Sequence, residues 1–311
     1  MVKPAATPNP DPAPRRQPLQ ALQPVQAIDH YENFPVASWL CPRALRAPVV
    51  ALYHFARTAD DLADEGDAPA DQRLADLGAY REALQIALQG QPPQPGSRWA
   101  PVFAALAAAV RSHRLPAEPL HHLLDAFEQD VRYTQAGQRY ADLAELRAYC
   151  ARSANPVGRL LLHLYGVADA TALARSDHIC TALQLINFWQ DLGVDLARNR
   201  CYLPLQDCQR HGCDAADLLQ RRSAPQAIQL IAHLSSVARL EMQKGLDLVH
   251  QIPGRAGWEL RLVVQGGLRV LDRIEALGFN TLSQRPTLRR RDLPVMLWRA
   301  LAMGVVRPQP V

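Results

Sequence analysis

The stretch Gln184–Asp195 constrains the fold more than any other part of the sequence. Asn187, Asp191 and Asp195 follow one another at intervals of four, so on a helix their oxygen-bearing side chains share one stripe. The positions around them are mostly apolar: Leu185, Ile186, Phe188, Leu192 and Val194. Carboxylates stacked in apolar surroundings repel one another and lose solvation. The stretch therefore predicts a largely buried helix whose polar stripe faces a cation, most simply a divalent ion.

A second acidic stripe lies far upstream. Asp60 and Asp64 are one helical turn apart, Asp61 lies beside them, and Arg57 precedes them by one turn. Alone, such a stretch is typical of a solvated helix end. Two acidic helices can instead face each other across a cavity, and carboxylates without His or Cys partners suit Mg²⁺, which binds a few carboxylates together with substrate phosphates. The two stripes together predict a diphosphate substrate and the metal ligands Asp60, Asp61, Asp64, Asp191 and Asp195.

Other motifs resemble one known family. Tyr149-Cys150 followed by Ala154, Val157 and Gly158 is similar to the Tyr-Cys-x-x-x-Ala-x-x-Val-Gly segment of the squalene/phytoene synthase family, the head-to-head trans-isoprenyl synthases. The two acidic stripes resemble the paired aspartate motifs of that family. The resemblance covers roughly residues 28 to 295.

Two further segments narrow the resemblance. Arg200-x-Tyr202-Leu203-Pro204 is similar to the Arg-x-Tyr-Leu-Pro that follows the family's second aspartate motif. The opening Tyr31–Leu40, with the sequence YENFPVASWL, looks like the bacterial hopanoid-pathway hydroxysqualene synthase branch. The resemblance thus implies an isoprenoid-synthase fold and chemistry on a prenyl diphosphate.

The resemblance also implies a role for individual residues. The residues expected to carry catalysis are Arg57, Asp60, Asp64, Asn187, Asp191 and Asp195. The residues expected to bind substrate are Tyr53, Arg57, Tyr149, Ala154, Val157, Gly158, Gln184, Asn187, Arg285 and Phe34. In the family the small residues beside a helix interruption shape the prenyl tunnel, and Asn155-Pro156 favours such an interruption here.

Ordinary structural roles remain open for several of these residues. Arg57 can be an intrahelical partner of Asp60 or Asp61, the two tyrosines can be core residues, and the small residues can be close-packing positions. The run Arg289–Arg291 is interpreted as a solvated basic patch. The pair His121-His122 has no ligand spacing to other metal-binding residue types.

Apolar residues at three-and-four spacing predict helices throughout, and no alternating strand pattern competes with them. The expected helical windows are 49–63, 71–88, 102–113, 120–133, 143–165, 172–196, 227–251 and 258–277. Breakers separate them: Gln91–Ser97 is a loop, Leu115-Pro116 precedes a helix, and Pro253-Gly254 ends one. We expect a single all-α bundle around a central cavity.

Composition sets the remaining expectations. The 311 residues are 48% hydrophobic, enough for a sizeable core, and a dispersed net charge of +4 argues against nucleic acid. The six cysteines show no metal-ligand pairing, which indicates reduced thiols in a cytoplasmic protein. We expect residues 1–26 to be a disordered Pro-rich tail, since they lack the pattern of a secretory signal. Residues 27–305 are expected to form the helical domain, and residues 306–311 a C-terminal tail. The sequence contains no run of about twenty apolar residues, so it predicts no membrane span. Peripheral contact at the inner face of the membrane stays open, because an insoluble product must leave into lipid.

For function, the resemblance implies that presqualene diphosphate, made by a sister synthase, is ionised, rearranged and captured by water to give hydroxysqualene. Two or three Mg²⁺ ions are expected, and no NADPH. Tyr31-Glu32-Asn33-Phe34 replaces the Ser-x-Ser-Phe of many relatives, and Gly266-Gly267 stands where relatives often have Tyr. Both departures argue against direct condensation of two farnesyl diphosphates. Glu32 and Asn33 are candidates to orient the quenching water, with a helix-cap or surface role as the alternative.

Three other functions stay open. The chain could join two prenyl diphosphates into presqualene or phytoene diphosphate, or it could form squalene with NADPH; the absence of a dinucleotide-binding glycine motif says little, since the family does not bind NADPH through one. A non-catalytic assembly factor on the same fold is the third. The intact acidic positions argue against it.

Overall fold

The computed structural model describes residues 40–94, 96–214, 218, 220, 224–252 and 254–303. Every regular element in these ranges is a helix, and none is a strand, so the all-α prediction is confirmed. The expectations for the two tails, and those for Tyr31–Phe34, concern residues outside the described ranges.

The first four helices form one group around their own apolar core. They are α1 (Arg43–Asp64), α2 (Ala70–Leu88), α3 (Ala100–His113) and α4 (Ala117–Ala136). Helix α1 buries Ala51, Phe55 and Ala59 at intervals of four and contacts α2, α3 and α4. Arg57 and Asp60 lie away from this buried line and stay partly exposed. The same period that builds this core therefore turns the acidic stripe away from it.

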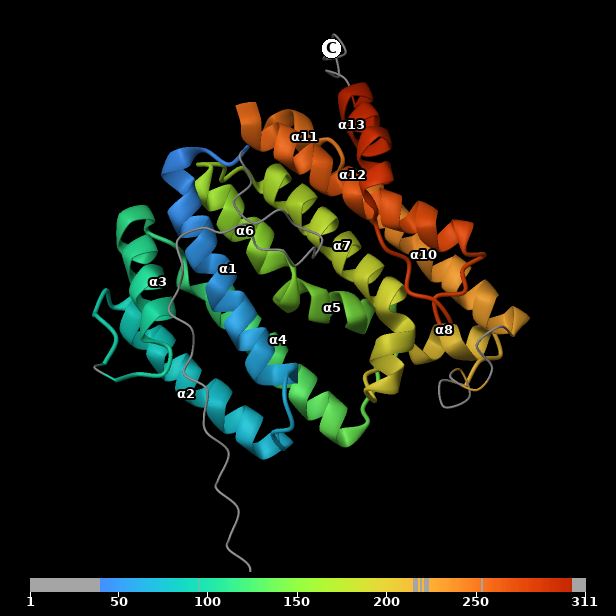
Figure 1. Cartoon of the computed structure of the whole chain (residues 1–311), viewed down its shortest axis with the longest axis horizontal. Helices are drawn as coiled ribbons and strands as arrows, with labels where there is room; N and C mark the ends of the chain where they lie inside the picture. The colour runs from blue at the N-terminus through green and yellow to red at the C-terminus, as the bar shows by residue number, and fades with distance from the viewer. Residues whose placement is uncertain are drawn as a thin grey trace, which may run out of the picture. The chain divides into compact units, whose positions relative to one another are not determined.

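The remaining helices pack around α7 (Ala170–Ala197), which lies in the middle of the second apolar core. They are α5 (Leu143–Ser153), α6 (Asn155–Leu164), α8 (Leu205–Arg210), α10 (Pro225–Gly245), α11 (Leu248–Gln251), α12 (Gly254–Ala276), the 3₁₀ turn η1 (Arg290–Asp292) and α13 (Leu293–Ala302). Helices α5, α6, α10, α11 and α12 all contact α7. In Figure 1, α7 runs between the blue α1 and the orange α10 and α12.

Several predicted boundaries agree with the structure, and a few elements differ. The window 143–165 is divided at Ala154, where the backbone leaves helical geometry just before Asn155-Pro156. The window 227–251 is also divided, after Gly245. Helices α8 and α13 have no counterpart among the predicted windows, because α8 is short and α13 is apolar on both faces, which removes the amphipathic period.

Two negative findings accompany this fold. All six cysteines are free thiols, as expected for reduced residues. Among the described helices, none combines the length and the apolar composition needed to cross a bilayer.

Candidate active site

The acidic end of α1 carries three carboxylates with oxygens close enough to share one ion. Ligand atoms of Asp60, Asp61 and Asp64 all lie within 4.8 Å of one another. Arg57, one turn earlier, donates to Asp60 Oδ2 at 2.9 Å and lies 2.9 Å from Asp61 Oδ1. Asp64 Oδ1 is buried and has no hydrogen-bond partner in the part of the chain that the structure describes. A buried carboxylate oxygen without a donor is suited to accept a cation.

Between Leu183 and Leu192 the accessible line on α7 is polar. Most side chains there are buried, whereas Gln184, Asn187 and Asp191 keep intermediate exposure. Intervals of three and four residues place these side chains on one side of the helix, and the third member of the predicted stripe, Asp195, is buried.

Arg200 links the two acidic helices. Its Nη1 donates to Asp64 Oδ2 at 2.9 Å, and its Nη2 lies 3.2 Å from Asp195 Oδ1. The chain reverses just after α7: Asn199 adopts a left-handed conformation with φ of 59°, and the Arg200 N–H donates to the Asp195 carbonyl at 2.9 Å. Asp64 and Asp195, which are 131 positions apart in the sequence, are thus within reach of one guanidinium.

The electrostatics of Asp195 follow from this position. Burial raises the pKa of the Asp195 carboxyl to about 6, and the neighbouring carboxylates of Asp191 and Asp64 act in the same direction. Arg200 opposes the increase. Asp195, Asp191 and Asp64 therefore carry more negative charge than Arg200 and Arg198 neutralise. A further cation would reduce this repulsion.

A loop from the C-terminal half adds a second arginine to α7. Arg285 donates to both oxygens of Asp191, through Nη2 to Oδ2 at 3.0 Å and through Nε to Oδ1. The loop is fixed on α7 by Gln190, whose Nε2 donates to the Pro286 carbonyl at 2.7 Å. It also runs against Gly193, where a Cβ would lie only 2.6 Å from the Leu282 carbonyl oxygen. Bidentate Arg–carboxylate geometry makes this a well-defined pair.

A tyrosine cluster stands behind Arg200. Asp130 of α4 accepts hydrogen bonds from the hydroxyls of Tyr149 at 2.5 Å and Tyr202 at 3.3 Å. The Tyr202 ring stacks on Phe188 of α7 with centroids 3.9 Å apart. Burial raises the pKa of the Asp130 carboxyl to about 7, while the two hydroxyl donors and Arg200 lower it. A carboxyl group that changes protonation state near neutral pH thus lies next to the acidic site.

The sequence indicates Arg200 and Tyr202 only as members of the Arg-x-Tyr-Leu-Pro motif. It does not indicate a role for Asp130. Asp130 gives no local signal, because its partners Tyr149 and Tyr202 are 19 and 72 positions away.

The other residues singled out from the sequence lie in different environments. Tyr53 is half-buried on α1, one turn before Arg57, with its ring at the edge of His54. Gly158 is buried where α6 meets α7, and a Cβ there would lie 2.4 Å from Ser176 Oγ. Ala154 occupies the break between α5 and α6, and Val157 is exposed. Phe34 lies outside the described residues.

The donor set fits a hard divalent ion. The carboxylate oxygens of Asp60, Asp61 and Asp64 lie together on α1, and Arg200 joins Asp64 to Asp195 of α7. Asp191 of α7 pairs with Arg285, and Asp60 and Asp61 pair with Arg57. Oxygen-only donors favour Mg²⁺ over softer metals. Arginines that pair with the carboxylates now could turn to phosphate oxygens, because a guanidinium binds both groups with the same fork.

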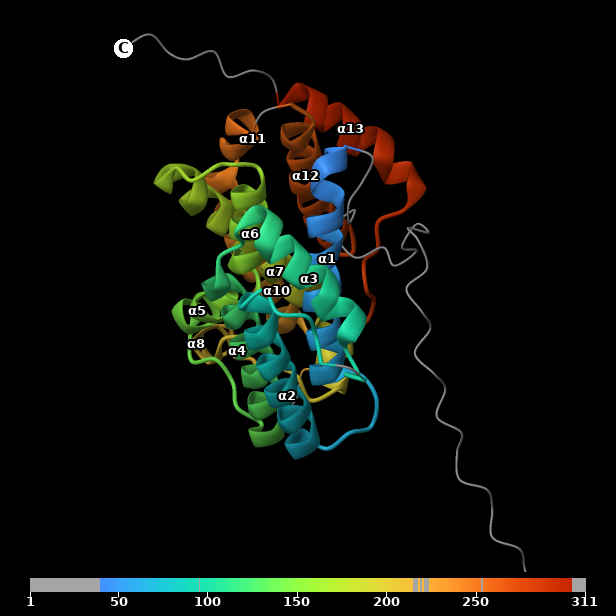
Figure 2. The same cartoon turned by 90° about the vertical axis from the view of Figure 1, so that its left-hand side faces the viewer.

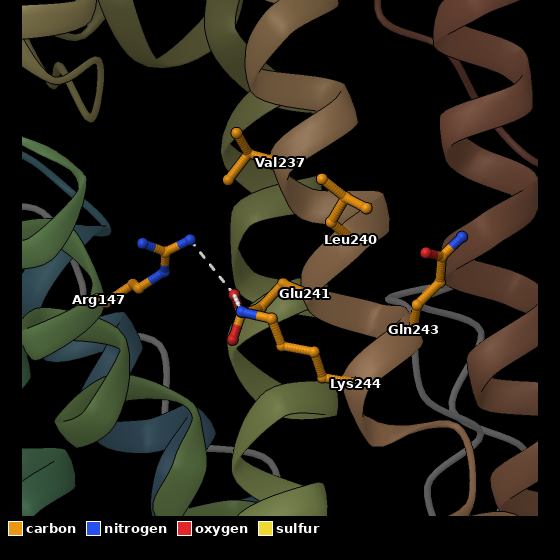
Figure 3. Close-up of a pocket in the computed structure, with 6 residues that line it drawn as sticks. All are labelled: Arg147, Val237, Leu240, Glu241, Gln243 and Lys244. Atoms are coloured by element: carbon orange, nitrogen blue, oxygen red, sulfur yellow. Dashed lines mark hydrogen bonds and ion pairs between the residues drawn. The ribbon is translucent and has the colours of Figure 1, made fainter.

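A separate pocket of about 500 Å³ lies between α5 and α10 and has different chemistry (Figure 3). Arg147 points across it toward the buried Glu241, which also accepts from His178 at 2.6 Å and from Lys244 at 3.2 Å. Burial favours the neutral form of Glu241, but these partners outweigh it and lower the pKa. With its carboxylate fully paired, this cluster ties α5, α7 and α10 together and does not resemble a reactive site.

Comparison with known proteins agrees with the geometry. The squalene/phytoene synthase family matches residues 28–292. The chain belongs to this family. A hydroxysqualene synthase of Sinorhizobium fredii is 34% identical over 85% of this chain and 84% of its own length. A phytoene synthase of Thermus thermophilus is 31% identical over 90% of this chain and 92% of its own.

A solved structure carries the same fold. The crystal structure of squalene synthase HpnC from Alicyclobacillus acidocaldarius has a TM-score of 0.72 and 36% identity, covering 82% of this chain and 92% of that one. The isoprenoid-synthase fold and the prediction of a prenyl-transferring enzyme of this family are thereby confirmed. Members of the squalene/phytoene synthase family act on prenyl diphosphates with a divalent metal at an aspartate-rich site, and α1 carries such a cluster.

Proposed function

We propose that the chain converts presqualene diphosphate to hydroxysqualene with the help of Mg²⁺ and without NADPH. The observation that carries the proposal is the pairing of the two acidic stripes through Arg200, in a chain that is similar over 85% of its length to a protein named hydroxysqualene synthase. The proposal includes a cytoplasmic location, a sister synthase as the source of substrate, and contact with the membrane surface for product release.

The bonds that change are few. The C–O bond to the diphosphate breaks and its electron pair leaves with pyrophosphate. The cyclopropylcarbinyl cation rearranges, a water oxygen bonds to the resulting allylic carbon, and a proton is lost to solvent. The sum is presqualene diphosphate plus water giving hydroxysqualene plus pyrophosphate, so no reductant is required.

The charge of the leaving pyrophosphate sets what the residues must do. Arg57 and Arg285 would bind its oxygens, and this role is supported by the carboxylate that each holds at one of the two acidic stripes. Asp60, Asp61, Asp64, Asp191 and Asp195 would hold Mg²⁺, which supplies further positive charge when bound, and the α1 cluster supports this role. Asn187 and Gln184 would orient the substrate by hydrogen bonds, and their partial exposure on α7 supports this role.

The tyrosines and the small residues are proposed to serve different parts of the substrate. Burial and the Asp130 carboxyl raise the pKa of Tyr149 well above its usual value, so its hydroxyl stays protonated and points at Asp130. Tyr53 and Tyr149 would lie near the diphosphate, and Ala154, Val157 and Gly158, with Phe34 of the N-terminal segment, would line the prenyl chain. An apolar lining excludes bulk water, which would quench the cation at the wrong carbon.

The deciding experiment is mass spectrometry of the products formed by purified chain from presqualene diphosphate, with and without NADPH and with and without Mg²⁺. Hydroxysqualene and pyrophosphate should appear only with Mg²⁺, in equal amounts whether or not NADPH is present. Squalene formed only with NADPH would overturn the proposal. Release of no pyrophosphate from any prenyl substrate would instead indicate a non-catalytic role.

One alternative reaction has an observation in its favour. The similarity to the Thermus thermophilus phytoene synthase covers as much of the chain as the similarity to the hydroxysqualene synthase. The alternative is condensation of two prenyl diphosphates to presqualene or phytoene diphosphate. Incubation with farnesyl or geranylgeranyl diphosphate alone separates the two: the proposed enzyme leaves both untouched, whereas a condensing enzyme consumes one of them.

A further inference from the structure

Helix α13 is attached to the domain by one narrow face. Met296 and Ala300, four residues apart, are buried, and α13 contacts α12. Met296 lies against Gly266 of α12, where an added Cβ would be in ordinary van der Waals contact with its Cε at 3.6 Å. Arg299, the single charged residue of α13, donates to Asp272 of α12 at 2.5 Å, although its side chain stays 42% accessible. The charge of α13 is therefore paired with α12.

The opposite face of α13 is apolar and exposed. Trp298 is 72% exposed, Leu301 59% and Leu297 50%. Leu293, Leu297 and Leu301 form a stripe at intervals of four, and the neighbouring stripe is also apolar: Pro294, Trp298 and Ala302. Figure 2 shows the red α13 at the edge of the helical domain, beyond α12. Contiguous apolar patches of this kind on soluble domains mark surfaces that bind a partner or a membrane.

Positive charge gathers at the start of the same helix. Arg289, Arg290 and Arg291 are all exposed. The adjacent acid, Asp292, is buried and accepts from Arg269 at 2.8 Å and Arg273 at 2.5 Å. These donors, against the effect of burial, lower the pKa of Asp292 to about 2, so it stays ionised and internally neutralised. The charge that η1 presents to the outside is therefore basic.

We propose that α13 and Arg289–Arg291 form a docking surface for an anionic lipid bilayer. Leu297, Trp298 and Leu301 would enter the boundary between headgroups and acyl chains, and the arginines would pair with lipid phosphates. A basic rim beside an apolar face with Trp and Leu is the chemistry of interfacial helices. The two exposed stripes of α13 offer one side-chain hydrogen-bonding group, the indole N–H of Trp298, and a Trp among Leu side chains is typical of helices at the membrane interface.

The docking surface is connected to the candidate active site along the chain. Helix α13 begins eight residues after Arg285, which pairs with Asp191, and Pro286 is held by Gln190 of α7. A bilayer at α13 thus lies at the end of the segment that carries Arg285, where an apolar product could pass into lipid. The assignment rests on the membrane contact included in the proposed function and names the residues that make it, and it would hold for any prenyl product.

The test is flotation of the full chain with vesicles of phosphatidylcholine alone and of phosphatidylcholine with 30% phosphatidylglycerol. We expect binding to the anionic vesicles, reduced at least about ten-fold by the double variant Leu297→Gln, Trp298→Gln, which removes exposed apolar area without touching the core. Arg290→Gln with Arg291→Gln should weaken binding about five-fold per arginine and reduce its salt dependence. Leu240→Gln, on α10 and 58% exposed, is the matched control and should bind as the parent does.

Three results would overturn the proposal. The first is equal binding by the parent and the Leu297→Gln, Trp298→Gln variant, or no binding at all. The second is a dimer of the parent, seen by light scattering, that this variant abolishes, because a second copy would then cover α13. The third is binding that appears only after residues 1–39 are removed, which would make that segment the occupant. Turnover of detergent-dispersed substrate should be unchanged in the docking variants, so failure of the proposed reaction and failure of docking are separable.

Discussion

The acidic stripes of α1 and α7 have the same chemistry but are held in different ways. On α1, Asp60 and Asp61 are partly exposed and are paired by Arg57 of the same helix. On α7, Asp191 and Asp195 are paired by Arg285 and Arg200, which come from segments outside the helix. The α1 stripe is thus paired mainly from its own helix, and only its Asp64 reaches a distant arginine, Arg200. Both pairs of the α7 stripe form only when the segments after α7 and α12 are in place.

This difference indicates separate duties for the two stripes. An exposed stripe with local partners can exchange an arginine for a metal at little structural cost. When the carboxylates of a stripe are paired by distant arginines, the site forms only if the domain is folded, and loss of a pair also lowers the stability of the domain. Substitutions on α1 should therefore affect mainly the reaction, and substitutions around α7 should affect both reaction and stability.

The largest effect is expected from removing one carboxylate of either stripe. Asp60→Asn and Asp191→Asn should each lower kcat by at least about 1000-fold, because each removes a predicted metal ligand facing the pyrophosphate. Steady-state pyrophosphate release measures it, and circular dichroism should show an unchanged helical fold. Asp76→Asn, on α2 and paired with Arg98, is the control that should keep its activity. Turnover that survives in either variant would exclude a metal cluster shared between α1 and α7.

The arginines should give a smaller effect. Arg57→Ala and Arg285→Ala should each lower kcat/KM about 10- to 100-fold, since each loses a charged hydrogen bond to the leaving group worth about 1.5–3 kcal/mol. The Lys variants should recover part of the loss, because the charge returns without the bidentate fork. Arg98→Ala, in the turn before α3, provides a matched exposed arginine. If Arg285→Ala and Arg98→Ala behaved alike, Arg285 would be only a surface partner of Asp191.

Stability should separate the two stripes more directly. Arg57→Gln should lower the free energy of unfolding by no more than about 0.5 kcal/mol, as for an exposed intrahelical pair. Arg200→Gln should cost about 2 kcal/mol, because it leaves Asp195 buried with fewer partners and removes the link to Asp64. Urea denaturation of the three proteins checks this order. Equal losses would show that Arg200 does not hold the α1 and α7 ends together.

The sequence predicted α1 and α7 well because both have a strong apolar period, and it predicted the division at Ala154 from Asn155-Pro156. It did not predict α13, whose exposed residues are as apolar as its buried ones. In the site, spacing alone placed Asn187 and Asp191 on one accessible line. Spacing did not predict the Arg200 bridge between Asp64 and Asp195 or the hydrogen bonds of Asp130, because these contacts depend on how distant helices pack. The catalytic, metal-binding and substrate-binding roles of all these residues stay predictions.

The smallest predicted effect concerns the protonation of Asp130, on the α7 side of the comparison. Burial raises its pKa from 3.8 to about 7, so the folded chain keeps a proton that the unfolded chain has released. Its contribution to stability is therefore complete below about pH 4 and is lost as the pH rises toward 7, with a slope of at most about 1.4 kcal/mol per pH unit. Asp130→Asn, which keeps a hydrogen-bonding oxygen for Tyr149, should remove this slope.

Thermal unfolding between pH 4.5 and 8 measures the difference between parent and Asp130→Asn. The melting temperature of the parent should fall relative to that of the variant up to about pH 7 and then run parallel to it. Glu118→Gln, at the exposed end of the same helix with a side chain 75% accessible, is the control and should stay parallel to the parent throughout. Parallel curves for Asp130→Asn as well would mean that the carboxyl is already ionised in the folded chain, and that Tyr149 and Tyr202 hold a charge beside Arg200. In that case the α7 side would, like α1, be organised around fixed negative charge.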